Sequence, residues 1–182
     1  MAKGTRNVAM AVAAAVVLGI PSLSVAADEL PDPPVSSAHV RSTNPRLAAL
    51  IQRAGERSAT FRRLVETIET SDSIVFIEPG HCGHAIRACF VDVTANASHR
   101  FMRVFVDIRK ADWDLVGSIG HELRHTIEVI EVPQIRDNAR MRLFYRQTGT
   151  YGTAFARETQ VAVDAGNTVR AEIRRFRQHQ AW

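Results

Sequence analysis

The sequence contains no glycine-rich phosphate loop, no internal repeat and no heptad array. Without these features there is no sign of a P-loop nucleotide-binding protein, a repeat protein or a coiled coil. Lysine is also scarce, because nearly all of the 23 basic residues are arginine. The arginines are scattered over the chain with no interleaved aromatic residues, so the sequence predicts no nucleic-acid partner.

A single long apolar run lies near the start of the chain. Two basic residues precede this run, which covers 8–20, and a small-x-small site follows it near Ala26 and Ala27. These features are typical of a cleaved secretory signal peptide, and the run is too short to span a bilayer comfortably. We therefore predict a signal peptide over 1–27, cut near Ala26 or Ala27, and a secreted or periplasmic protein with no membrane contact after cleavage.

About 155 residues follow the predicted cleavage site. A chain of this length forms one domain with one hydrophobic core and is too short for two. Residues 28–43 are rich in proline and serine, which predicts an extended lead-in, and a single domain is expected over 44–182. Loss of Lys3 and Arg6 with the signal peptide lowers the formal charge from +4 to +2, so the mature protein is not strongly basic.

Helical and strand patterns occur in separate blocks of the predicted domain. Asn44 and Ser58 are suited to cap two helices in which apolar residues recur at helical spacing. Three runs rich in β-branched and aromatic residues follow, joined by short connections, at 73–78, 88–95 and 100–108. In the third run, the even-numbered residues 102–108 are apolar and share one face of the strand.

Helical patterns return over 112–132, over 136–146 and from about 153 to 177. The predicted fold class is therefore α+β. It consists of N-terminal helices, a small antiparallel sheet of about three strands, and then C-terminal helices.

Of the two cysteines, Cys82 lies between the first two predicted strands and Cys89 lies at the start of the second. In an exported chain, an even number of cysteines at close spacing favours a disulfide. A bridge between them would hold the connecting loop. Two alternatives are a metal site formed by His81, Cys82, His84 and Cys89, and a pair of free thiols.

The segment "GSIGHELRHTIEVIE", 117–131, contains the pattern H-E-x-x-H within a predicted helix. His121 and His125 are four residues apart, so both side chains project from one face of the helix and can reach the same metal ion. Glu122 is rotated by about 100° from His121 around the helix axis, which places its carboxylate beside that ion. A metal and a neighbouring carboxylate can together turn water into a nucleophile.

The stretch "IGHELRH", 119–125, resembles the active-site helix of zinc metallopeptidases of the zincin type. The resemblance covers roughly 100–170, and it implies a zincin-like domain that holds one Zn2+ ion and hydrolyses peptide bonds with Glu122 as general base. A wider pattern is similar to a family of exported bacterial proteins without an established function. It consists of "TFRRLVETIETSD", a cysteine hairpin and then the H-E-x-x-H helix.

A catalytic zinc site needs a third protein ligand, and the candidates are Glu128, Glu131 and Glu158. Glu128 shares the face of His121, but its backbone lies about 10 Å along the axis, whereas the metal would lie about 3 Å along. Glu131 is farther along and rotated away. Glu158 begins an apolar stripe on the last predicted helix, so its carboxylate is expected to be at least partly buried and to need a partner such as a metal. The alternative partner is an arginine such as Arg157 or Arg146.

The stretch "ETQVAVDAG", 158–166, is similar to the glutamate-bearing helix of gluzincins. This resemblance implies that His121, His125 and Glu158 bind the metal. It also implies a supporting acidic residue further along the helix, and the candidate is Asp164. Asp164 lies six residues after Glu158, a wider spacing than the family has.

Peptide hydrolysis also benefits from a donor that stabilises the oxyanion of the tetrahedral intermediate. Tyr151 lies in a glycine-flanked loop before Glu158 and is the candidate for this role. Tyr145 is the weaker candidate, because its helical position suits packing.

The leading hypothesis is an exported, zinc-dependent metallopeptidase that acts on a peptide or protein substrate. The strand over 100–108 is expected to be the sheet edge along which an extended peptide pairs. The alternative is a non-catalytic exported domain that retains the same helix for metal binding, structure or interaction. The sequence does not indicate an oligomeric state.

Overall fold

The computed structural model describes residues 38–110, 113–148, 150–151 and 157–180. The predicted signal peptide and most of the predicted lead-in lie outside the described residues. All of the described residues belong to one unit, Asp32–Trp182. Within them, no helix is both long enough and apolar enough to cross a membrane.

Two capped helices form the start of the domain. Helix α1 covers Pro45–Arg57 and helix α2 covers Ala59–Glu69. The Asn44 side chain accepts hydrogen bonds of 3.0 and 3.2 Å from N–H groups in the first turn of α1, and the Ser58 hydroxyl accepts one of 3.0 Å in α2. These contacts confirm both predicted caps. A short strand β1, Val40–Arg41, lies within the predicted lead-in.

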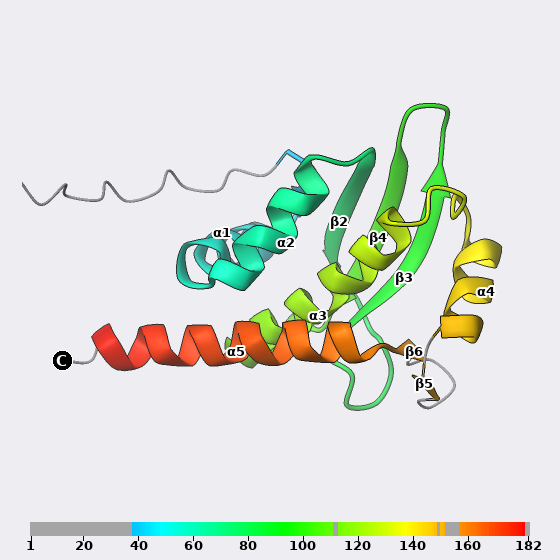
Figure 1. Ribbon diagram of the computed structural model, residues 1–182. Coiled ribbons are helices and arrows are strands. Elements are labelled where there is room, and N and C mark those ends of the chain that lie inside the picture. Colours follow the sequence, from blue (N-terminus) through cyan, green and yellow to red (C-terminus); the bar gives the residue numbers. More distant parts are fainter. Residues whose placement is uncertain (1–37, 111–112, 149, 152–156, 181–182) are drawn as a thin grey trace, which may run out of the picture. The chain divides into compact units, whose positions relative to one another are not determined.

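The central sheet has four strands in the order β1-β2-β4-β3 (Figure 1). The longer strands are β2 (Ser73–Pro79), β3 (Ala88–Ala95) and β4 (Arg100–Val106). β2 pairs in parallel with β1 and β4, whereas β3 pairs antiparallel with β4 at the edge. The α+β class is confirmed, but the predicted antiparallel sheet of about three strands is wrong in detail, because the sheet has four strands and is mixed. The strand predicted over 100–108 is not the edge, because β4 lies between β2 and β3.

The mixed pairing results from the connection over 80–87, which passes the end of β4 before β3 begins. The backbone N–H of Gly80 donates to the Val106 carbonyl at 3.0 Å. This close passage requires glycine at position 80, because a Cβ there would lie 2.4 Å from Cγ of Phe105. The chain therefore leaves the position beside β2 open, and β4 fills it after the β3–β4 hairpin.

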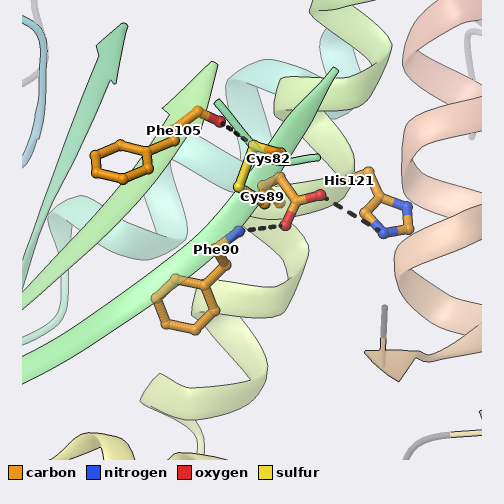
Figure 2. Close-up of a disulfide and its surroundings, with 6 residues drawn as sticks. Cys82, Cys89, Phe90, Phe105 and His121 are labelled. Carbon is orange, nitrogen blue, oxygen red and sulfur yellow. Dashed lines mark hydrogen bonds and ion pairs between the residues drawn. A yellow bond between two sulfur atoms is a disulfide. The ribbon is translucent and has the colours of Figure 1, made fainter. Parts of the chain in front are cut away.

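A disulfide joins Cys82 in this connection to Cys89 in β3, with an S–S distance of 2.10 Å (Figure 2). It confirms the predicted bridge, and both alternatives, a metal site with these cysteines and two free thiols, are wrong. The Cys82 sulfur also lies 3.5 Å from the carbonyl oxygen of Phe105 in β4. The bridge thus holds the crossing loop against the sheet and against the start of β3.

Three further helices follow the sheet. They are α3 (Trp113–Ile130), α4 (Asn138–Thr148) and α5 (Gln160–Gln180). A 3-10 turn, Ile108–Lys110, precedes α3. A two-stranded hairpin lies between α4 and α5 and consists of β5 (Thr150–Tyr151) and β6 (Arg157–Glu158).

The last helix begins later than the sequence predicts. Its first turn is capped by Thr159, whose hydroxyl accepts a hydrogen bond of 3.2 Å from the N–H of Ala162, so α5 starts at Gln160 and not near 153. Glu158 therefore belongs to strand β6 and does not open the apolar stripe of the helix. The stripe itself is confirmed, since Ala162, Val169 and Ile173 are fully buried.

The helices are layered over one face of the sheet (Figure 1). α2 and α3 contact the strands, and α5 lies along α3. The covered face consists of alternate residues in β2 and β4, which are Val75, Ile77, Met102, Val104 and Val106. Burial of each of these side chains stabilises the fold by about 1.5–3 kcal/mol. The face predicted for residues 102–106 is therefore confirmed.

Glycines allow α3 and α5 to approach each other closely. A Cβ on Gly166 would lie 2.9 Å from the Gly117 carbonyl oxygen and 3.0 Å from Cβ of His121. A Cβ on Gly120 would lie 3.0 Å from Cγ2 of Val169. Larger side chains at these positions would push the two helices apart, because packed interiors have little free volume.

Arg100 anchors the C-terminal end of α3 to the sheet. Its side chain is 3% exposed and donates to the carbonyls of Val129 at 2.9 Å and Ile130 at 3.1 Å. These carbonyls belong to the last turn, which has no partners within the helix. Asp72 balances the buried charge, with Oδ1 2.6 Å from Nη2 of Arg100.

Replacing Asp72 by Asn should remove this counter-charge and leave the buried guanidinium without it. Partial burial favours the protonated form of Asp72, but hydrogen bonds and charge from Arg100 outweigh this effect and lower its pKa. We expect urea denaturation at pH 7 to show a loss of about 1–2 kcal/mol in unfolding free energy, a modest value because the carboxylate is partly exposed to solvent.

Measuring the unfolding free energies of Asp72→Asn and the parent protein at lower pH shows whether the loss of stability comes from the missing charge or from the changed shape of the side chain. A lowered pKa means that the stabilisation is present above the unfolded-state value of 3.8 and is lost as the pH falls through the folded-state value. The gap between Asp72→Asn and the parent protein should therefore narrow as the pH falls below 3.8. An exposed control, Asp114→Asn, should change stability by less than about 0.5 kcal/mol. A penalty for Asp72→Asn that stays constant with pH would contradict the electrostatic explanation.

Candidate metal centre

Helix α3 directs both histidines of the H-E-x-x-H pattern toward one point. The Nε2 atoms of His121 and His125 lie 3.1 Å apart, and the rings meet edge to face. The side chains are only 15% and 7% exposed. Two ring nitrogens therefore converge in a largely buried position, as the four-residue spacing predicts.

The third member of the group comes from β6. Oε2 of Glu158 lies 3.2 Å from Nε2 of His121, and the ligand atoms of His121, His125 and Glu158 all lie within 4.8 Å of one another. Glu158 reaches this position because α5, which follows it, packs against α3 with Gly166 beside Cβ of His121. His121, His125 and Glu158, the three residues singled out from the sequence, thus form a group that could hold a metal ion. This set of three residues is called the metal group below.

Two separations in this group are close to those expected around a four-coordinate ion, and all of its ligand atoms lie within 4.8 Å of one another. Ligand atoms about 2.0–2.1 Å from a tetrahedral ion lie about 3.3 Å from each other. The separations of 3.1 Å between the two imidazole nitrogens and 3.2 Å between His121 and Glu158 are close to this value. Three protein ligands leave one position open, which is typical of catalytic rather than structural sites.

Glu128 supports the group from behind His125. Its Oε2 lies 2.9 Å from Nδ1 of His125, and its Oε1 accepts a hydrogen bond of 2.5 Å from the Thr159 hydroxyl. A carboxylate at Nδ1 holds the proton on that nitrogen and leaves Nε2 free for a metal. Because Thr159 directly follows Glu158, the same carboxylate also links the segment of the third ligand to α3.

This contact changes the supporting residue that the resemblance implies. Asp164 is exposed and accepts a hydrogen bond of 2.9 Å from Gln160, so its expected role belongs instead to Glu128. Glu131, which is too far along the helix axis and rotated away from the histidines to be a ligand, pairs with Arg124 at 3.0 Å. The signal for Glu128 in the sequence is its three-residue spacing from His125, which places it beside the ring nitrogen that faces away from the group.

Glu122 is buried between α3 and the edge strand. Its Oε2 accepts a hydrogen bond of 2.8 Å from the N–H of Phe90 in β3, and its Oε1 lies 3.9 Å from Nε2 of His121 (Figure 2). Burial raises the pKa of Glu122, and the opposing effects of the two histidines and the Phe90 N–H are weaker. A carboxylate with one oxygen held and a raised pKa is suited to accept a proton beside the metal group.

His121 and Glu158 stabilise each other's charged forms. Burial disfavours the imidazolium, but the hydrogen bond to Glu158 and the charges of Glu158 and Glu122 outweigh it, so the pKa of His121 is raised. The same hydrogen bond lowers the pKa of Glu158. A metal binds only the neutral imidazole, so protons compete for His121 more strongly than for an ordinary histidine.

The two candidate tyrosines have different positions. The backbone of Tyr151 belongs to β5, but its side chain lies outside the described part of the structure, and its role as oxyanion donor stays a prediction. Tyr145 is buried, its hydroxyl donates to the carbonyl of His125 at 2.8 Å, and its ring meets the His125 ring edge to face. Burial raises the pKa of Tyr145, so it stays protonated and supports His125.

The metal group lies in the wall of a cleft of about 740 Å³. The disulfide loop and the first half of β3 form one side of the cleft, and α4 contributes a second side. Besides the metal group and Glu122, the lining includes His81, Ile86, Ala88, Val91, Met141 and Arg142. This volume is in the range of sites that bind small-molecule ligands.

Comparisons with known proteins do not assign the chain to a family. No family model matches the sequence, and searches of curated proteins and of solved structures give no match.

Replacing Glu128 by Gln should weaken metal binding without removing a ligand. The amide keeps the shape of the side chain but loses the charge that orients His125, so we expect affinity to fall by about 10–100-fold. Glu131→Gln is the matched control, because Glu131 directly follows the same helix but pairs with Arg124. The measurement is a competition titration with Co2+, whose absorption spectrum reports its coordination.

The aspartate variant refines this test. Glu128→Asp keeps the charge but shortens the reach, and it should recover part of the affinity lost in Glu128→Gln. Equal affinities for Glu128→Gln and Glu131→Gln would contradict a supporting role for Glu128.

Proposed function

We propose that the protein is an exported, zinc-dependent metallopeptidase. The observation that carries the proposal is the position of Glu122, which lies beside the group of His121, His125 and Glu158 in the wall of a cleft of about 740 Å³. A structural metal site would need neither a neighbouring buried carboxylate nor a cleft. A site that activates water needs both.

Zinc is the metal that the donor set favours. Two imidazole nitrogens and one carboxylate oxygen are a ligand set typical of catalytic zinc, with the fourth position left open. When bound there, zinc would supply Lewis acidity and lower the pKa of water at the open position. His121, His125 and Glu158 would hold it, and Glu128 would keep Nε2 of His125 available.

Glu122 is the proposed general base. Its Oε2 is fixed by the Phe90 N–H, so Oε1 is the oxygen that faces His121 and can take a proton from the attacking water. The raised pKa of the buried carboxyl allows it to hold that proton and then deliver it to the leaving amine. The rigid backbone contact keeps the carboxylate in place for both transfers.

An extended peptide would pair with β3, the edge strand that borders the cleft. Edge strands bind peptides through their free backbone groups, and the first half of β3 lines the cleft beside Glu122. This replaces the strand over 100–108 as the proposed substrate-binding edge.

Export is proposed from the predicted signal peptide over 1–27. The Cys82–Cys89 disulfide is compatible with it, because such bridges persist in oxidising compartments. In a secreted or periplasmic setting, the enzyme would act on peptides or proteins outside the cytoplasm.

The Glu122→Gln variant tests the mechanism most directly. It should bind zinc at near one ion per chain, as the parent protein does, because Glu122 is not a ligand. Its hydrolysis of a mixed casein-derived peptide substrate should fall by about 10²–10⁴-fold, because the amide cannot accept a proton. Glu56→Gln, a change on the exposed surface of α1, is the control and should match the parent in both assays.

The His121→Ala variant, compared with the parent protein, distinguishes a metallopeptidase from a non-catalytic metal-binding domain. Loss of zinc in this variant, together with hydrolysis by the parent protein, supports the peptidase. Stoichiometric zinc in a parent protein that hydrolyses no peptide favours a non-catalytic, exported metal-binding domain. Full activity of Glu122→Gln would overturn the proposed chemistry.

A further inference from the structure

The outer edge of β3 is divided into an open half and a covered half. The covered half begins at Asp92, where the side-chain amide of Asn138 donates to the Asp92 carboxylate. The same side chain accepts a hydrogen bond of 2.8 Å from the N–H of Val93. Arg136 donates to the carbonyl of Asn96 just beyond the strand. The α3–α4 connection and the start of α4 therefore occupy the edge from Asp92 onward (Figure 1).

The open half is short and lies in the cleft. Residues 88–91 of β3 line the cleft, whereas Asp92 and Val93 do not. A shift in register between Phe90 and Asp92 separates the two halves, and such bulges often end regular pairing beside active sites. Within it, the N–H of Phe90 is already bonded to Glu122. Four residues of extended strand span about 13 Å, so the edge that a peptide can use is at most this long.

The position of Glu122 makes this short edge asymmetric. The carboxylate is bonded to the N–H of Phe90, so the reacting position lies at the level of Phe90. On the α4 side, only Val91 remains before the edge that Asn138 occupies. On the opposite side, the edge continues through Cys89 and Ala88 to the loop that the disulfide holds.

We infer that the substrates are short peptides or the ends of longer chains, and not the interior of long extended segments. This inference rests on the proposed peptidase function and defines its substrate class. A peptide that extends past Val91 would have to leave the strand edge, because the backbone N–H of Val93 and the space beside it are already occupied. The α4 side therefore accepts about one residue beyond the scissile bond, whereas the disulfide side accepts more.

Mapping the cut bond in peptides of defined length tests the inference. The zinc-loaded parent protein is incubated with a mixed-sequence library of peptides of about twelve residues, whose extended length is about three times that of the open edge. Mass spectrometry then locates each cut. We expect cuts within about two residues of one end, and the same end in all peptides. Frequent cuts near the middle, with several residues on both sides, would overturn the inference and leave the peptidase intact.

The variant Asn138→Ala opens the covered edge. Removal of this side chain frees the N–H of Val93, so the cuts should move at least one residue further from the preferred end. Asn167→Ala, on the exposed surface of α5, is the matched control and should leave the pattern unchanged. If Asn138→Ala does not fold, Arg136→Ala, which removes the contact to Asn96 at the edge of the hairpin, provides the second variant and should show a smaller shift in the same direction.

A binding measurement separates failure of the inference from failure of the function. Zinc-loaded Glu122→Gln protein is titrated with acetylated and amidated mixed-sequence peptides of increasing length, followed by fluorescence anisotropy. Affinity should stop rising at about five residues, since longer peptides find no further edge to pair with. A steady rise up to twelve residues contradicts the short edge. No binding of any peptide and no cleavage by the parent protein refute the peptidase itself.

Discussion

The close packing of α5 on α3 is the contact on which the candidate metal centre depends. The two histidines lie on α3, but Glu158 lies more than thirty residues later, in a hairpin that precedes α5. Gly117 and Gly166 let the two helix backbones meet, with Gly166 beside His121. Thr159 then joins the start of α5 to Glu128 on α3. A wider helix separation would carry Glu158 away from His121 while leaving each helix intact.

The sheet supplies the second constraint. Arg100 ties the last turn of α3 to the start of β4, and the Phe90 N–H ties Glu122 to β3. α3 is thus fixed to the sheet at its far end and at the site itself. The side chain next to the metal group is oriented by a backbone group of the edge strand. Substrate pairing and proton transfer in the proposed mechanism consequently depend on the same strand.

Local features of the fold were predictable because they depend on neighbouring residues. Caps at Asn44 and Ser58 and the alternation in β4 follow from side-chain chemistry over a few positions. Strand order was not predictable in this way, since the periodicity of β3 is the same whether it lies beside β2 or beyond β4. Gly80 lets the chain pass close to Phe105 where it leaves β2. Its requirement for close passage becomes evident only when the partner of β2 is known.

In the candidate site too, features that depend on neighbouring residues were predictable, whereas those that depend on distant segments were not. His121 and His125 could be placed from helix geometry alone, whereas Glu158 was predicted on a helix and lies in a strand, because Thr159 caps α5 after it. The apolar stripe of α5 nevertheless pointed to the carboxylate that lies with the two histidines, since burying that stripe against α3 places the preceding segment next to His121. Glu128 illustrates the converse. Its distance along the axis excludes it as a ligand, yet the same spacing puts it at the other nitrogen of His125. In a metal site on a helix, the partner of each ring nitrogen of a histidine therefore matters. The group bonded to the nitrogen that faces away from the metal determines whether the other nitrogen is free to bind it.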